Sequence, residues 1–182
     1  MSDVGAPVHG GQASARRNRE EQQVPPRALI TAVAADLLHR LRDRHGPVMF
    51  HQSGGCCDGS SPMCYPDGEF IVGDRDVLLG VLEGAPVWIS GPQFEAWKHT
   101  QLVIDVVPGR GGGFSLETPE GMRFLSRGRA FTDAENELLA TAPPLTGVDY
   151  ERGARPPERA DLESPKPRTC AIPGRRAEGV EP

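Results

Sequence analysis

Proline is the residue that most limits where this chain can fold. Of the 18 prolines among 182 residues, eight lie between Pro143 and Pro182, where they alternate with charged residues and leave few aliphatic side chains. Such a segment buries too little apolar surface to offset the entropy lost when it becomes ordered. The first 24 residues are also poor in apolar side chains. We therefore predict disordered extensions at 1–24 and 143–182 and one folded domain at 25–142.

The distribution of charge and apolar residues excludes several classes of partner. The net charge of −5 belongs to residues 27–142, which contain ten basic and fifteen acidic side chains. An acidic domain without a basic stripe argues against nucleic acid. The apolar runs are far shorter than the roughly 20 residues that cross a bilayer. Because residues 1–23 lack the apolar centre of a secretory signal, we expect a cytoplasmic protein with no membrane or nucleic-acid partner.

The apolar pattern predicts a helix followed by several short strands. Thr31 can cap a helix in which apolar residues recur at helical spacing until Gly46-Pro47 ends it; these are Val33, Leu37, Leu38 and Leu41. Short apolar runs predict strands at 48–51, 69–72, 77–82, 86–90, 101–107, 114–117 and 122–125. Thr132 and Glu135 have the spacing of a capping box for a short last helix. The predicted class is α+β, with a twisted and mostly antiparallel sheet.

Three of the four cysteines fall within nine positions, directly after the strand predicted to end at His51. Thiols in the cytosol are kept reduced, so clustered cysteines favour a metal or redox role over structural disulfides. Thiolates are soft ligands for zinc, copper and iron–sulfur clusters, and Gly54-Gly55 gives the chain freedom to bend around an ion. We predict a metal site, for iron, zinc or an iron–sulfur cluster, formed by Cys56, Cys57, Cys64 and His51.

Other interpretations of these residues remain open. Neighbouring side chains on an extended backbone point in different directions, so Cys56 and Cys57 can bind one ion only if the chain bends sharply. One alternative is a thiol-based redox protein or switch, in which Cys56 or Cys57 attacks and Cys64 resolves. Another is that the cysteines only fill space and the chain is a metal-free protein-binding module. A site shared between two chains of a homodimer also remains open.

Two further patterns are interpreted as turns. The run Arg110-Gly-Gly-Gly113 lacks the lysine and the following helix of a phosphate-binding loop, so we predict a flexible hairpin loop. Four aspartates could supply oxygen ligands, but acidic residues in turns usually shape the turn itself; they are Asp58, Asp67, Asp74 and Asp76. No catalytic residue is assigned to either pattern.

Two long segments carry a resemblance to a known family. The segments HQSGGCCDGSSPMCYPDGEF and GAPVWISGPQFEAWKHTQLVIDVVPGRGGGFSLETPEGMRF resemble the bacterial family called domain of unknown function 779. Members of that family are described as associated with aldehyde dehydrogenases. The resemblance implies an accessory protein rather than an enzyme, with an aldehyde dehydrogenase or a similar protein as its partner.

A second resemblance concerns the order of elements around the cysteines. A helix, a strand, a Gly-Gly-Cys loop, two further strands and a glycine-rich turn are arranged similarly in the HesB-like A-type carriers of iron–sulfur assembly. In those carriers the Gly-Gly-Cys segment supplies one cluster ligand, which Cys56 matches here. A Cys-Gly-Cys near the C-terminus supplies two more, whereas the segment after Glu120 reads Gly-Met-Arg-Phe-Leu-Ser-Arg. The resemblance implies a HesB-like fold and an iron–sulfur ligand at Cys56.

Overall fold

The protein is α+β, as predicted from the sequence. A computed structural model describes residues 23–52, 61–111 and 113–156. The strands are β1 (Ala28–Ile30), β2 (Val48–Gln52), β3 (Pro62–Pro66), β4 (Val77–Leu82), β5 (Ala85–Ile89), β6 (Thr100–Pro108) and β7 (Met122–Ala130). The helices are α2 (Ala32–His45), α3 (Gly91–Trp97), α4 (Asp133–Ala140) and α5 (Gly147–Glu151), with a 3-10 turn η1 at Thr118–Glu120.

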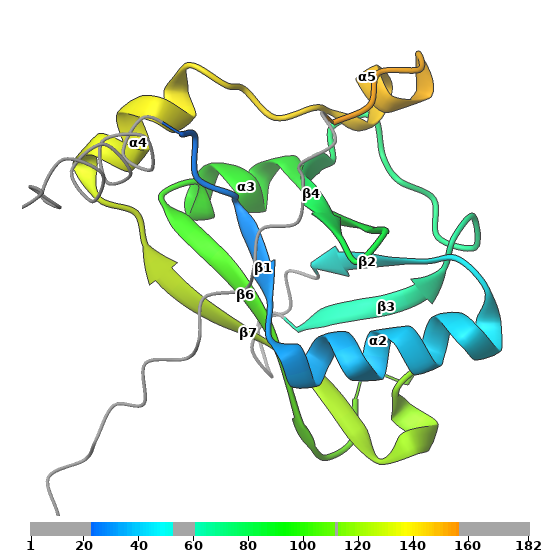
Figure 1. Cartoon of the computed structure of the whole chain (residues 1–182). Coiled ribbons are helices and arrows are strands. Elements are labelled where there is room, and N and C mark those ends of the chain that lie inside the picture. The colour runs from blue at the N-terminus through cyan, green and yellow to red at the C-terminus, as the bar shows by residue number, and fades with distance from the viewer. Residues whose placement is uncertain (1–22, 53–60, 112, 157–182) are drawn as a thin grey trace, which may run out of the picture.

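The strands form two sheets instead of the single sheet expected. One sheet has the order β1-β6-β7 and the other has the order β3-β2-β5-β4. The pairs β1–β6 and β2–β5 are parallel, and the pairs β2–β3, β4–β5 and β6–β7 are antiparallel. Among the described strands, antiparallel pairing therefore predominates, as predicted. In Figure 1, β2 and β3 run across the view, whereas β6 and β7 run from the upper left to the bottom.

Helix α2 begins and ends where the sequence predicts. The Thr31 side chain accepts a hydrogen bond from the backbone N–H of Ala34, and Gly46 ends the helix with a φ of 81°, which favours glycine. The buried face of the helix consists of Ala34, Leu37, Leu38 and Leu41. Val33, which we expected on that face, is 62% exposed. The face is thus rotated by one residue at the first turn.

Two apolar clusters lie on opposite faces of the four-stranded sheet. The larger one joins α2 to both sheets and includes Val48, Phe50 and Cys64 from β2 and β3. The smaller one consists of Met49, Leu78 and Trp88, with Tyr65, Phe70, Leu145 and Tyr150 packed against it. Side chains alternate along a strand, so successive residues of β2 contribute to different clusters. This alternation decides where the predicted ligands lie.

The described chain continues beyond the domain boundary expected at 142. Residues 143–156 are described, and α5 opens with a capping box between Thr146 and Asp149. Leu145 and Tyr150 join the smaller apolar cluster, and Thr146 forms an isolated antiparallel bridge with Val77. These apolar side chains anchor a segment whose overall composition predicts disorder. The rest of that predicted tail, at 157–182, and residues 1–22 lie outside the described part of the chain.

The segment around β3 also differs from prediction. The strand expected at 69–72 is a turn and an irregular stretch, and residues 114–117 form no strand. Instead, Pro62–Pro66 forms β3 at the edge of its sheet, a position where proline is tolerated because its missing N–H faces no neighbouring strand. Cys64 is therefore part of a strand and not part of a loop.

Candidate functional site

The pairing of β2 with β3 places two of the predicted ligands on opposite faces of the sheet. Cys64 is paired with Phe50, and His51 is paired with Met63. Phe50 and Cys64 both face the larger cluster, whereas Met49, two residues before His51, faces the smaller one. The structure therefore does not bring His51 and Cys64 together, and one ion cannot contact both side chains through the sheet.

Cys64 lies in an environment that disfavours a thiolate. The residue is 0% exposed and belongs to the larger apolar cluster. Burial raises the pKa of the Cys64 thiol far above its ordinary value, and the nearby negative charge of Glu117 raises it further. A metal ligand or an attacking group requires the deprotonated sulfur. Cys64 is thus a core residue in this fold.

Glu117 is a buried polar group beside this core. It is 1% exposed, and its carboxylate accepts hydrogen bonds from the Ser115 hydroxyl and from the backbone N–H of Phe124. The Ser115 hydroxyl in turn accepts from the backbone N–H of Cys64 at 2.9 Å. Burial raises the pKa of Glu117, although these hydrogen bonds oppose the shift. The arrangement joins the β6–β7 connection to β3 and presents no free ligand atom.

Gly111, between β6 and β7, is required to be small by this buried carboxylate. A Cβ atom at Gly111 would lie 2.6 Å from an oxygen of Glu117 and 2.8 Å from the hydroxyl of Thr118. Only glycine allows the backbone to approach so closely. Gly111 lies in the connection between the antiparallel strands β6 and β7, which is longer than the hairpin loop expected because 114–117 forms no strand.

His51 and Asp76 form an ionisable pair on the other face. The Nε2 atom of His51 lies 3.1 Å from an oxygen of Asp76, and the two side chains are 13% and 15% exposed. The same Asp76 oxygen accepts a hydrogen bond of 2.9 Å from the backbone N–H of Gly73. A carboxylate only accepts hydrogen bonds, so Nε2 carries the hydrogen and Nδ1 remains as the basic nitrogen of the neutral ring.

Aromatic rings fix the orientation of the imidazole. The ring of Phe70 lies 4.5 Å from the His51 ring, and Tyr65 stacks on Phe70 at 4.9 Å. Packing of this kind limits the motion of the imidazole. His51 is thus held by a carboxylate at one nitrogen and by rings on one face.

The remaining predicted ligands lie in a segment that adjoins this pair in sequence. Cys56 and Cys57 belong to residues 53–60, outside the described residues, and that segment begins directly after β2. Within 23–52, 61–111 and 113–156, no group of three or more His, Cys, Asp or Glu side chains is placed to hold a metal ion. On the face of His51, the described residues thus place the His51 imidazole beside the Asp76 carboxylate.

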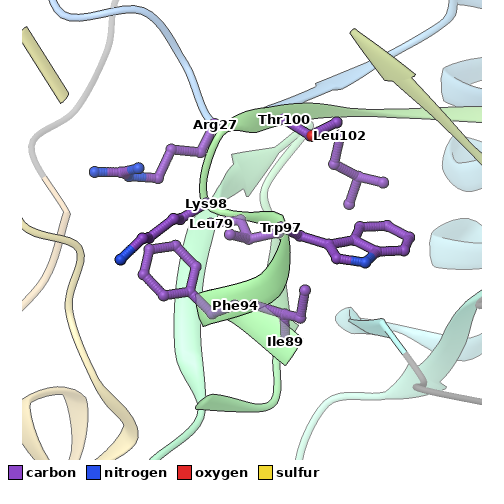
Figure 2. Close-up of a pocket in the computed structure, with 8 residues that line it drawn as sticks. All are labelled: Arg27, Leu79, Ile89, Phe94, Trp97, Lys98, Thr100 and Leu102. Atoms are coloured by element: carbon purple, nitrogen blue, oxygen red, sulfur yellow. The ribbon is translucent and has the colours of Figure 1, made fainter. Parts of the chain in front are cut away.

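A hollow beside α3 is too small for a ligand. It is lined mainly by apolar side chains of β4, β5, β6 and α3, with Arg27 and Lys98 at its rim. In Figure 2 the charged ends of these two side chains point to the same side, away from Trp97 and Leu102. Arg27 donates to the carbonyls of Leu139 and Ala142. The free volume of about 10 Å³ holds at most one water molecule.

Comparison with known proteins places the chain in a family. The fold and the site define a small α+β protein with a carboxylate–imidazole pair at the end of a central strand. The model of the family described as Domain of unknown function (DUF779) matches residues 37–130, and the chain belongs to this family. The match confirms the family resemblance and includes His51, Cys64 and Asp76. Searches of the curated proteins and of the solved structures found no match.

The sequence indicated His51 but not its partner. Asp76 stands in a run with Asp74 that is typical of turns, and 25 residues separate it from His51. No spacing rule connects residues so far apart; only the fold brings them together.

None of the described helices is long and apolar enough to cross a membrane.

Proposed function

We propose that this protein is a metal-binding accessory protein whose site forms where β2 ends. His51 would supply one nitrogen ligand, and Cys56 and Cys57, which follow in the sequence, would supply thiolates. The ion is iron or zinc, or an iron–sulfur cluster. The observation that carries the proposal is the His51–Asp76 contact of 3.1 Å. Histidines that bind metals commonly donate their other N–H to a carboxylate, which fixes the tautomer and increases ligand basicity.

The proposed ligand set omits Cys64. Its sulfur is fully buried on the opposite face of the sheet from His51, and its pKa is raised by burial. Asp76 takes its place as the group that supports the site, through its contact with the His51 imidazole. A site of nitrogen and sulfur ligands suits zinc and iron better than magnesium or calcium, which prefer oxygen.

Elemental analysis tests this proposal. The protein is purified anaerobically without a metal-binding tag, as wild type and as Cys56→Ser, Cys57→Ser, His51→Ala and Cys64→Ala. We expect stoichiometric metal in the wild type and in Cys64→Ala, and its loss in His51→Ala and in at least one of the other two variants. An absorption spectrum separates a coloured cluster from colourless zinc. Metal-free wild-type protein would contradict the proposal.

A second candidate function is a thiol-based redox switch. In this alternative Cys56 or Cys57 reacts with peroxide or a disulfide, and His51 acts as the nearby base. The burial of Cys64 argues against its role as the resolving thiol, since a disulfide partner must reach its sulfur. If metal-free protein forms an intramolecular disulfide under peroxide, mass spectrometry of its peptides identifies the pair. A Cys56–Cys64 or Cys57–Cys64 bond would favour the switch and require local opening of β3.

The proposed partner is an aldehyde dehydrogenase or a similar enzyme. This part of the proposal rests on the family resemblance, and the support provided is metal delivery, maturation or protection of a reactive thiol. Co-purification of the chain with the enzyme, with and without Cys56 and Cys57, tests it. Binding that survives removal of both thiols would favour a metal-free binding module instead.

The likeness to HesB-like carriers stays a proposal about cluster chemistry. It is supported by Cys56 in a Gly-Gly-Cys segment after the first long helix and its strand. Strand β7 carries no cysteine, so a cluster here would need its further ligands from Cys57, from His51 or from a second chain. Transfer of a cluster to an apo-ferredoxin would support this form of the proposal, and a purely zinc-containing protein would exclude it.

A further inference from the structure

The turn that carries Asp76 is hydrogen-bonded to residues 145–150, which we name the C-terminal segment. The backbone N–H of Gly147 donates to the carbonyl of Asp76 at 2.8 Å, and that of Val148 donates to the carbonyl of Asp74 at 3.3 Å. In the other direction, the N–H of Leu78 donates to the carbonyl of Leu145 at 2.9 Å. Figure 1 shows α5 beside the connection between β3 and β4.

Gly147 allows this contact because it has no side chain. A Cβ atom at Gly147 would lie 2.2 Å from the carbonyl oxygen of Gly73, well inside any real contact distance. Gly147 does not adopt a positive φ, so the close packing and not the backbone conformation requires glycine. The N–H of Gly73 also donates to the Asp76 carboxylate. The C-terminal segment therefore touches the same turn that orients the carboxylate.

The far end of the segment contacts the neighbour of His51. Tyr150 packs edge-on against Trp88, with ring centroids 5.3 Å apart. Trp88 is paired with His51 across β5 and β2 and is 1% exposed. Aromatic contacts of this kind contribute beyond the area they bury. One short segment thus supports Asp76 through its backbone and the surroundings of His51 through a ring.

We infer that the C-terminal segment is a positioning element for the His51–Asp76 pair. The inference rests on the proposed function and deepens it. By fixing the turn at Asp76, the segment keeps Nε2 of His51 engaged and leaves Nδ1 for a metal ion. This support lies outside residues 37–130, the part matched by the family model. Asp76 and the C-terminal segment are positioning groups and His51 is the ligand.

The test follows the Nε2 hydrogen of His51 by NMR in protein labelled with ¹⁵N-histidine. A hydrogen bonded to a carboxylate in a partly buried site exchanges slowly with water and gives a downfield signal, which His51→Gln assigns. We expect this signal in the wild type and its loss in Asp76→Ala, Gly147→Ala and Tyr150→Ala. The controls Tyr150→Phe, which keeps the ring, and Gly113→Ala, where an added Cβ meets nothing within 4 Å, should keep it.

A second measurement connects the segment to the metal. Zn²⁺ affinity, measured by competition with a chelator, should fall by about tenfold or more in Gly147→Ala and Tyr150→Ala, the usual effect of removing support from a ligating histidine. Circular dichroism identifies the variants that fold. If the signal persists in both folded variants, or is missing from the wild type, the inference is overturned. If the wild type binds no Zn²⁺ but its signal is lost in both variants, the proposed function alone is contradicted.

Discussion

The ionisable side chains on the two faces of the β2–β3 pair differ in solvent exposure and in their partners. On the face toward α2, Cys64 and Glu117 are 0% and 1% exposed, and burial raises the pKa of each. On the other face, His51 and Asp76 pair with each other and their side chains retain 13% and 15% exposure. Ionisable residues on the two faces of this strand pair are thus placed in a closed core and in a partly open site.

This difference shows which groups are available for chemistry. Desolvation penalises the charged form, so burial makes a thiol or a carboxyl harder to ionise. His51 and Asp76 lie near solvent, so a ligand can reach them without opening the core. Among these four groups, His51 and Asp76 are therefore the more accessible to solvent, whereas Cys64 is part of the core.

The largest expected effect contrasts adjacent residues of β2. Phe50→Ala removes a fully buried ring that packs edge-on against Phe124 and should cost about 3–5 kcal/mol of unfolding free energy. His51→Ala removes a partly exposed ring and one hydrogen bond and should cost about 1 kcal/mol. Urea denaturation measures both. Equal losses would mean that the two faces are equally buried in solution and would break the comparison.

A smaller effect is expected at Cys64. Cys64→Ser buries a hydroxyl among apolar side chains and should cost about 1–3 kcal/mol, because the buried hydroxyl loses its hydrogen bonds to water. Cys64→Val retains apolar packing and serves as the control.

In the native protein Cys64 should also resist a thiol-specific reagent until urea unfolds the chain. Rapid labelling of Cys64 in native protein would show that this face opens.

The pH dependence of stability sharpens the comparison at Glu117. Its folded pKa is raised by burial above the ordinary value of 4.5, so the native state holds this proton more tightly than the unfolded state. Its contribution to stability is therefore full below pH 4.5 and is lost as pH rises through the folded pKa. Glu117→Gln removes the ionisable carboxyl and with it this pH-dependent contribution to stability.

Urea denaturation of wild type and Glu117→Gln over a pH series checks this sign. The wild type should lose stability relative to the variant as pH increases above about 4.5, the ordinary glutamate value. Glu135 provides the reference for the opposite sign, because the hydrogen bond from Arg129 lowers its pKa to about 2. A stability difference that grows in favour of the wild type with rising pH would contradict the burial of Glu117.

The smallest expected change in unfolding free energy is at an exposed residue, which serves as the reference for the other substitutions. Phe114 lies between β6 and β7 and is 85% exposed, so it belongs to neither face. Phe114→Ser should change the unfolding free energy by less than about 0.5 kcal/mol, as for most surface substitutions. A larger loss would indicate that Phe114 is covered in solution, for example by a second chain, and size-exclusion chromatography would then detect the change.

Local signals in the sequence account for much of the fold. Thr31 and Gly46 fix the ends of α2, and Thr132 with Glu135 forms the capping box that opens α4, as predicted. Each of these signals acts within one turn of chain. Strand β3 was missed because Pro62 and Pro66 bound it, and proline argues against a strand unless its edge position is known. Edge position is a tertiary property.

The candidate site was only partly predictable for the same reason. His51 follows an apolar strand and precedes the cysteines, which singled it out. The partnership with Asp76 depends on the placement of a turn by β4 and by residues 145–150. Residues 145–150 were assigned to the disordered tail because the sequence around them is rich in proline. Leu145 and Tyr150, which pack against the smaller cluster, did not outweigh that composition. Cys64 was misplaced because its strand was missed.

The absorption spectrum of Co²⁺-loaded Cys64→Ala tests the central claim most directly. Cobalt takes the place of zinc or iron and gives a sulfur-to-cobalt charge-transfer band when thiolates bind it. If the thiolates lie on the face of His51, Cys64→Ala retains the band at wild-type intensity and His51→Ala weakens it. Loss of the band in Cys64→Ala, with the variant still folded, would contradict the separation of the two faces.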